Sequence, residues 1–203
     1  MIRKAAIAAV VIAGSGLIAM TLLTRDTGED QFAECRASQV GGADLGGPFE
    51  LVNGQGETVT SAALITEPTL IYFGYTMCPD VCPLDVDRNA AAVEILEERG
   101  QIVTPVFISI DPERDTPEVV GDFADVMHPR MIGLTGTPEQ VQVASKAYRT
   151  YYKAHPEVDG EYLVDHSTFS YLVLPDVGFV DFFRRELSPE QLADNIGCYV
   201  DKI

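Results

Sequence analysis

The order of apolar and polar positions in the middle of the chain predicts strands that alternate with helices. Residues 70–75 (Leu-Ile-Tyr-Phe-Gly-Tyr) form a continuous apolar run, typical of a strand buried at the centre of a sheet. In residues 85–99, apolar side chains recur every three or four positions, as on one face of a helix, and Gly100 follows at the expected helix end. Residues 106–110 predict a second core strand, with Pro105 at its first position.

Turn and cap signals divide the rest of the chain. Residues 53–56 (Asn-Gly-Gln-Gly) predict a hairpin, and residues 169–183 predict another one. Three helices should begin at Thr116, Thr137 and Ser188, because each hydroxyl cap is followed by proline and an acid. The order hairpin, strand, helix, strand, two helices, hairpin, helix predicts an α/β sheet with helices on both faces.

The N-terminus predicts a membrane anchor. A short basic head precedes residues 5–23, which contain no charged side chain and would span about 28 Å as a helix. We interpret residues 1–25 as an uncleaved transmembrane helix; the alternative is a cleaved secretory signal, whose apolar part is usually shorter. Residues 26–47 are polar and Gly-rich and predict a tether. We therefore expect a single-pass inner-membrane protein whose domain, residues 48–203, lies in the periplasm.

The net charge of the chain limits which kinds of molecule it can bind. The 203 residues include 31 acidic and 14 basic side chains, which gives a net charge of −17. Such a surface repels phosphate backbones, so we exclude nucleic-acid binding. Solubility is the simplest role for this charge, and docking of a basic partner is the alternative.

Cys78 and Cys82 directly follow the first core strand and stand where the first long helix begins. Pro83 has no N–H to donate, so we expect the regular helix to start at or after it. Helix N-terminal N–H groups would favour thiolates in the loop before it. This pair can form a disulfide or share a metal ion; two buried structural cysteines are the alternative. A dithiol at the first strand-to-helix junction, followed by a late hairpin and a final helix, indicates a thioredoxin-like fold with an N-terminal β-hairpin extension.

The three histidines are not equivalent as third ligands. His128 is expected to be exposed at a helix end, and His155 to be solvated in a polar loop. His166 immediately precedes the late hairpin strand, whose loop faces the dithiol in a thioredoxin-like fold. We therefore predict His166 as the ligand, and we assign Met77 to packing rather than to ligation.

Two thiolates and one imidazole suit a soft ion. Thiolates select copper(I), whereas imidazole also suits copper(II), and zinc usually requires a fourth ligand. Catalytic dithiols of this fold normally enclose two residues, whereas three separate Cys78 from Cys82, which widens the bite for a metal. A thiol peroxidase is disfavoured, because the proline that its motif places upstream of the reactive cysteine is missing.

Cys35 and Cys198 form a second possible pair. Disulfides persist outside the cytoplasm, so we predict a structural bridge that joins the two ends of the domain; two free thiols are the alternative. In the chain-entropy model, closing so long a loop contributes up to about 5 kcal/mol.

Four motifs resemble the Sco/SenC family of membrane-anchored copper-handling proteins, over a region from about residue 46 to the C-terminus. They are residues 72–83 (YFGYTMCPDVCP), 109–117 (SIDPERDTP), 133–136 (GLTG) and 165–168 (DHST). The resemblance implies copper ligands at Cys78, Cys82 and His166. It also implies delivery of copper to the dinuclear copper centre of cytochrome c oxidase, or reduction of that centre's cysteines. It makes the 111–117 loop structural rather than ligating.

Two main hypotheses follow. The first is a copper metallochaperone, which is not an enzyme and passes its ion to the receiving subunit of cytochrome c oxidase. Other copper chaperones or thiol reductants are its further expected partners. The second is a thiol–disulfide oxidoreductase that uses Cys78 and Cys82. A redox or copper sensor is a third possibility.

Overall fold

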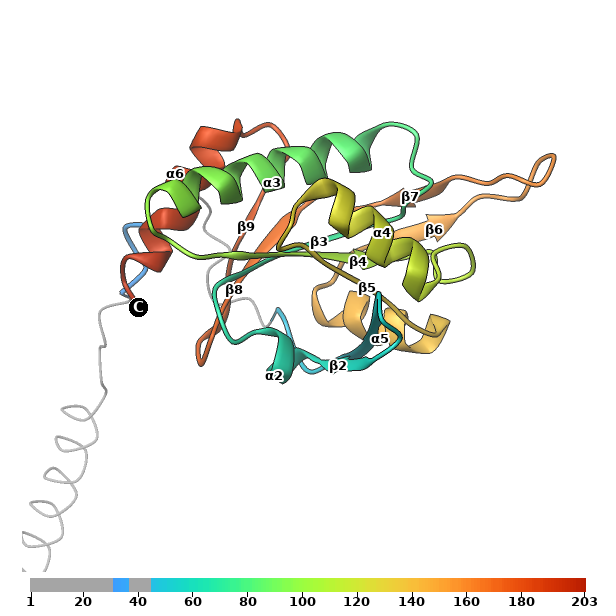
Figure 1. Cartoon of the computed structure of the whole chain (residues 1–203), viewed down its shortest axis with the longest axis horizontal. Helices are drawn as coiled ribbons and strands as arrows, with labels where there is room; N and C mark the ends of the chain where they lie inside the picture. The colour runs from blue at the N-terminus through green and yellow to red at the C-terminus, as the bar shows by residue number, and fades with distance from the viewer. Residues whose placement is uncertain (1–30, 37–44) are drawn as a thin grey trace, which may run out of the picture. The chain divides into compact units, whose positions relative to one another are not determined.

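The computed structural model describes residues 31–36 and 45–203 (Figure 1). The chain divides into two units: the first ends at Glu34, and its described residues form a turn, whereas the second, Cys35–Ile203, carries the fold. The expected anchor and most of the expected tether lie outside the described residues. Within the described part of the chain, no helix combines the length and the apolar character that crossing a membrane requires.

Seven strands form one mixed sheet in the order β2-β1-β5-β4-β3-β8-β9. The central strands β3, β4 and β5 run parallel, while β1 pairs antiparallel with β5, and β8 antiparallel with β3. The bounds are β1 Glu50–Asn53, β2 Thr58–Thr60, β3 Thr69–Gly74, β4 Thr104–Ser109, β5 Ile132–Thr135, β8 Ser170–Leu174 and β9 Gly178–Phe183. Strands β6 (Tyr152–Ala154) and β7 (Val164–His166) form a separate antiparallel hairpin.

Helices cover both faces of the sheet, as the sequence predicts. They are α2 (Ser61–Leu64), α3 (Val81–Glu98), α4 (Pro117–Met127), α5 (Pro138–Ala147) and α6 (Pro189–Val200). In Figure 1, α3 and α6 lie along one face, and α2 and α5 lie beneath the other. The three predicted caps are confirmed: Thr116, Thr137 and Ser188 each accept a hydrogen bond from the backbone N–H three residues on.

Both core strands and both hairpins of the predicted sheet are confirmed, whereas β5 and the β6–β7 hairpin were not predicted as strands. β5 has only four residues, one of which is Gly133, so it lacks a long apolar run. Pro105 is the second residue of β4, not the first. Its missing N–H is tolerated because β5 pairs with β4 only from Val106 onwards.

The predicted start of α3 was wrong. The helix begins at Val81, and Cys82 and Pro83 are its second and third residues. The first backbone N–H groups of a helix have no partner within it, so a proline in the first turn removes no hydrogen bond. Cys82 is therefore helical, and Cys78 alone lies in the preceding loop.

Strand β3 positions this loop. All six of its residues are buried, because it lies between β4 and β8 with helices on both faces. The chain leaves the sheet after Gly74, and a short loop, residues 75–80, leads into α3. The predicted ligands should meet at this edge of the sheet, where β3 ends; we call this edge the rim.

Candidate metal centre

The two sulfurs of the dithiol lie at the start of α3. Cys78 donates its backbone N–H to the carbonyl of Tyr75 (3.2 Å), which closes a tight turn after β3. The backbone N–H of Cys82 points at the Cys78 Sγ at 3.3 Å. A free N–H of the first helical turn therefore holds the Cys78 sulfur close to Cys82. Both cysteines are buried, and neither forms a disulfide.

His166 reaches the same place from the end of β7. Its Nε2 lies 3.2 Å from the Cys82 Sγ, and its Nδ1 lies 2.8 Å from the carbonyl oxygen of Ser167. A carbonyl only accepts, so the proton of the neutral ring is on Nδ1 and the Nε2 lone pair faces the sulfur. The backbone thus selects the tautomer that can bind a metal through Nε2.

The ligand atoms of Cys78, Cys82 and His166 all lie within 4.8 Å of one another. Metal bonds to thiolate and imidazole are about 2.0–2.3 Å long, so three ligands spread evenly around one ion are roughly 3.5–4.0 Å apart. A shift of up to about 1 Å would therefore bring the three donor atoms around one ion. The predicted ligand set is assembled from segments 84 residues apart in the chain.

Burial sets the protonation of these groups. It raises the pKa of the Cys82 thiol, against the preference for thiolate that was expected at the helix start. The largest cause is the withdrawal of the thiol from water, and the neighbouring Cys78 thiol raises this pKa further. Burial also lowers the pKa of His166, which keeps the ring neutral. An incoming soft metal would thus meet a free imidazole lone pair and would have to displace the proton of Cys82.

Two tyrosines, Tyr72 in β3 and Tyr75 just after it, contact the imidazole of His166. The Tyr72 and Tyr75 rings each stand edge-on to His166, with centroids 6.2 and 5.9 Å away. The Tyr72 hydroxyl donates to Asp85 (3.0 Å), and the Tyr75 hydroxyl accepts from the backbone N–H of Val164 (3.3 Å). Tyr75 therefore connects the dithiol loop directly to β7.

Gly74 leaves room for the Cys82 sulfur. A Cβ at this position would lie 3.0 Å from the Cys82 Sγ and equally close to the rings of Phe107 and Tyr72. The last residue of β3 must therefore be small for the second sulfur to reach the rim.

Asp115 is a site residue that the sequence reasoning did not single out. Its carboxylate accepts from the backbone N–H and the hydroxyl of Thr76 (3.0 and 2.5 Å) and from the hydroxyl of Ser109 (2.6 Å). It therefore fixes the loop that carries Cys78. The sequence feature that could have indicated Asp115 is its position in the 109–117 motif. The family resemblance assigned the loop in this motif a structural role.

Neither of the other histidines belongs to the ligand set, and Met77 is exposed. His128 is buried at the end of α4 and accepts from the Arg130 N–H (3.1 Å), so its predicted exposure was wrong. It is buried because α4 ends against the sheet and the ring caps the following turn. His155 is half-exposed and pairs with Asp165 (2.9 Å). Met77 is 59% exposed, so it does not pack in the core as expected.

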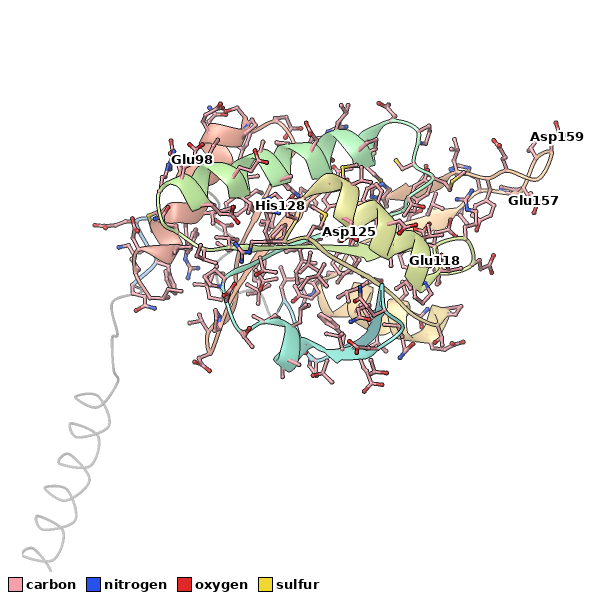
Figure 2. The ribbon with its side chains drawn as sticks, in the orientation of Figure 1. Glu98, Glu118, Asp125, His128, Glu157 and Asp159 are labelled. Atoms are coloured by element: carbon pink, nitrogen blue, oxygen red, sulfur yellow. A yellow bond between two sulfur atoms is a disulfide. The ribbon has the colours of Figure 1, made fainter. Side chains whose placement is uncertain are left out.

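Cys35 and Cys198 are joined by a disulfide with a Cα–Cα distance of 5.6 Å. Cys198 lies in α6, where Gln101, just beyond the end of α3, donates to the neighbouring Gly197 carbonyl (3.3 Å). Figure 2 places Glu98 at this end of α3. The bridge is thus at the end of α3 opposite Cys82.

A cavity of about 660 Å³ adjoins the dithiol loop. It is lined by residues of that loop, of the β4–α4 loop and of the β6–β7 hairpin, among them Met77, Pro79, Arg114, Val158 and Leu163. Figure 2 shows Glu157 and Asp159 at the tip of the hairpin. This cavity beside the dithiol loop is therefore mostly apolar, with Glu161 in its lining, and neither Cys78 nor Cys82 lines it.

A thioredoxin-like domain with a dithiol and an imidazole at one rim defines a class of proteins that bind soft metals or exchange thiols. Within that class, the sequence profile of SCO1/SenC matches residues 37–201. The chain belongs to the SCO1/SenC family.

The relatives include Protein SenC of Rhodobacter capsulatus, which is 53% identical over 98% of this chain and 90% of its own length. The mitochondrial SCO1 homologue of Homo sapiens is 37% identical over 93% of this chain, which spans 64% of the human protein. The crystal structure of Arabidopsis thaliana ScoI with copper bound is 43% identical with a TM-score of 0.72, and covers 78% of this chain and 97% of its own. The crystal structure of yeast Sco1 with copper bound is 38% identical, with a TM-score of 0.73. This match covers 78% of this chain and 89% of the yeast chain.

Proposed function

We propose that this chain is a copper carrier that holds one ion between the sulfurs of Cys78 and Cys82 and the Nε2 of His166. The observation that carries this proposal is the position of these three soft donors within 4.8 Å of one another. The copper-bound Arabidopsis and yeast relatives support the choice of ion.

The donor set suits a carrier better than a permanent metal site. Three protein ligands leave copper(I) open to attack by an incoming ligand. The ring of His166 is neutral and its lone pair is already directed at the sulfurs, so binding requires little rearrangement. Uptake and release therefore depend on ligand exchange at the rim of the sheet.

The recipient in this proposal is the subunit of cytochrome c oxidase that holds the dinuclear copper centre. The chain would act from the periplasmic side of the inner membrane, anchored by residues 1–25, and other copper chaperones or thiol reductants would supply the ion or the electrons. Family membership and the apolar N-terminal sequence support this part of the proposal.

Competition titration with a copper(I) chelator tests the carrier function. The reduced wild-type protein should bind one copper(I), and Cys78→Ser, Cys82→Ser and His166→Ala should each weaken binding by at least about 10-fold. His155→Ala is the matched control, because His155 is half-exposed on the same hairpin and pairs with Asp165. Unchanged affinity in His166→Ala would rule out the proposed ligand set.

A second candidate function is thiol–disulfide exchange, which is favoured by two free sulfurs side by side at a helix start. One sulfur would attack a substrate disulfide and the other would then displace the reduced substrate, which leaves the Cys78–Cys82 disulfide. Here His166→Ala should preserve the exchange rate, whereas Cys78→Ser should abolish it. A redox or copper sensor would use the same dithiol, with its oxidation or metal loading read by a partner.

A further inference from the structure

The β4–α4 loop touches both parts of the candidate metal centre. Through Asp115 it binds Thr76, two residues before Cys78. Through Asp111 and Arg114 it binds Tyr162, which lies four residues before His166. One short loop therefore contacts the segment that carries the sulfurs and the segment that carries the imidazole.

The contacts with Tyr162 are several and directional. The Arg114 Nε donates to Asp111 (2.5 Å) and its Nη1 donates to the Tyr162 carbonyl (3.0 Å). The guanidinium also lies 3.7 Å from the centre of the Tyr162 ring, and the Tyr162 hydroxyl donates to the other oxygen of Asp111 (2.6 Å). The planar guanidinium of Arg114 therefore pairs with Asp111, bonds the Tyr162 carbonyl and stacks on the Tyr162 ring. Together these interactions hold Tyr162 in a single geometry.

The same loop also lies beside the tyrosine that contacts the histidine. The same guanidinium lies 5.6 Å from the ring centre of Tyr75, which stands edge-on to His166 and bonds the N–H of Val164. The hairpin has only three residues in each strand, β6 and β7, and is not part of the main sheet. A two-stranded hairpin is marginally stable by itself, so its contacts with the domain decide where its last residue lies.

We propose that Asp111, Arg114 and Tyr162 form a latch that positions His166 over the dithiol. The proposal rests on the proposed copper function, and the three are positioning residues, because none of them supplies a ligand atom. With the latch closed, the Nε2 of His166 is 3.2 Å from the Cys82 sulfur. Without it, the hairpin moves and copper loses its third ligand.

A double-mutant cycle tests whether the latch acts through the histidine. Copper(I) affinity is measured for the wild type, Arg114→Ala, His166→Ala and the double variant. Arg114→Ala should weaken binding roughly 10-fold, as loss of an outer partner of a ligand does. In the His166→Ala background the same change should have less than about a twofold effect, since the ligand it positions is gone.

Arg130→Ala is the matched control, because the Arg130 side chain also bonds several partners, Glu97, Glu67 and Thr104, away from the centre. It should leave copper affinity unchanged. Tyr162→Phe retains the ring beneath Arg114 and removes only the bond to Asp111, so it should weaken binding less and in the same His166-dependent way. If Arg114→Ala does not fold, the Tyr162→Phe variant tests the latch in its place.

A measurement without copper separates the latch from the proposed function. Nuclear magnetic resonance of the reduced, metal-free protein should show the ring protons of His166 shifted towards exposed-histidine values in Arg114→Ala, because the ring leaves Tyr72 and Tyr75. Failure of the wild type to bind copper, with this shift present, would overturn the function and support the latch. An unmoved His166 ring, or an equal loss of affinity in both backgrounds of the cycle, would overturn the latch.

Discussion

Cys82 and His166 face each other at 3.2 Å, and burial acts on both of them in favour of the uncharged form. It raises the pKa of the thiol and lowers the pKa of the imidazole. The metal-free pair is therefore a protonated thiol beside a neutral ring. The proton that copper must displace belongs to Cys82.

Copper(I) affinity should consequently rise with pH. Each proton released on binding contributes about a factor of ten per pH unit while the thiol remains protonated. Because the pKa of His166 is lowered, ring protonation opposes binding only at pH values below the ordinary histidine pKa of about 6.5. Competition titrations at a series of pH values measure the slope. A flat profile from neutral to alkaline pH would show that Cys82 is already ionised or is not a ligand.

Asp115 acts on the site through Thr76. Asp115→Asn should lower the free energy of unfolding by about 1.5–3 kcal/mol, because an amide nitrogen would meet donors that now bond a buried carboxylate. Chemical denaturation measures the loss. Asp125→Asn, exposed on α4 (Figure 2), is the control and should stay within about 0.5 kcal/mol. Equal effects at both positions would contradict the assignment.

At the scale of elements, the junction of β3 with α3 depends on close packing. Gly74→Ala should lower the free energy of unfolding by about 1–3 kcal/mol and weaken copper binding, because its Cβ would press on the Cys82 sulfur. Thermal unfolding and copper titration of the same variant measure both effects. Gly47→Ala is the control, since a Cβ there meets only Ala147 at an ordinary 3.5 Å. A stable Gly74→Ala variant with full affinity would show that the rim is looser than described.

Periodicity and caps were sufficient to predict the long elements, since α3 and the buried strands have strong local patterns. Short elements were missed because their stability comes from neighbours: β5 needs β4 and β1 on its flanks, and β7 needs β6. The ligands Cys78, Cys82 and His166 could be selected by chemistry and chain order. The Asp111–Tyr162 contact could not, because nothing in either segment indicates its partner 51 residues away.

At the scale of the whole molecule, the two pairs of cysteines lie at opposite ends of α3. The bonded pair, Cys35 and Cys198, ties the N-terminal approach of the domain to its last helix, while the free pair stays at the rim. A cross-link between residues 163 apart restricts the unfolded chain without touching the centre.

Cys35→Ser combined with Cys198→Ser should therefore lower the free energy of unfolding by up to about 5 kcal/mol. One copper(I) per chain should still bind with wild-type affinity, because the bridge is remote from the ligands. Denaturant unfolding and copper titration of the double-serine protein measure these separately. A loss of copper binding in a folded variant would contradict the separation of the two pairs.

The most direct test of the ligand set is anomalous X-ray diffraction at the copper edge from crystals of the reduced, copper(I)-loaded protein. We expect one peak per domain, bonded to the sulfurs of Cys78 and Cys82 and to the Nε2 of His166. A peak held by the sulfurs with the imidazole turned away, or a peak at any other position, would contradict this ligand set.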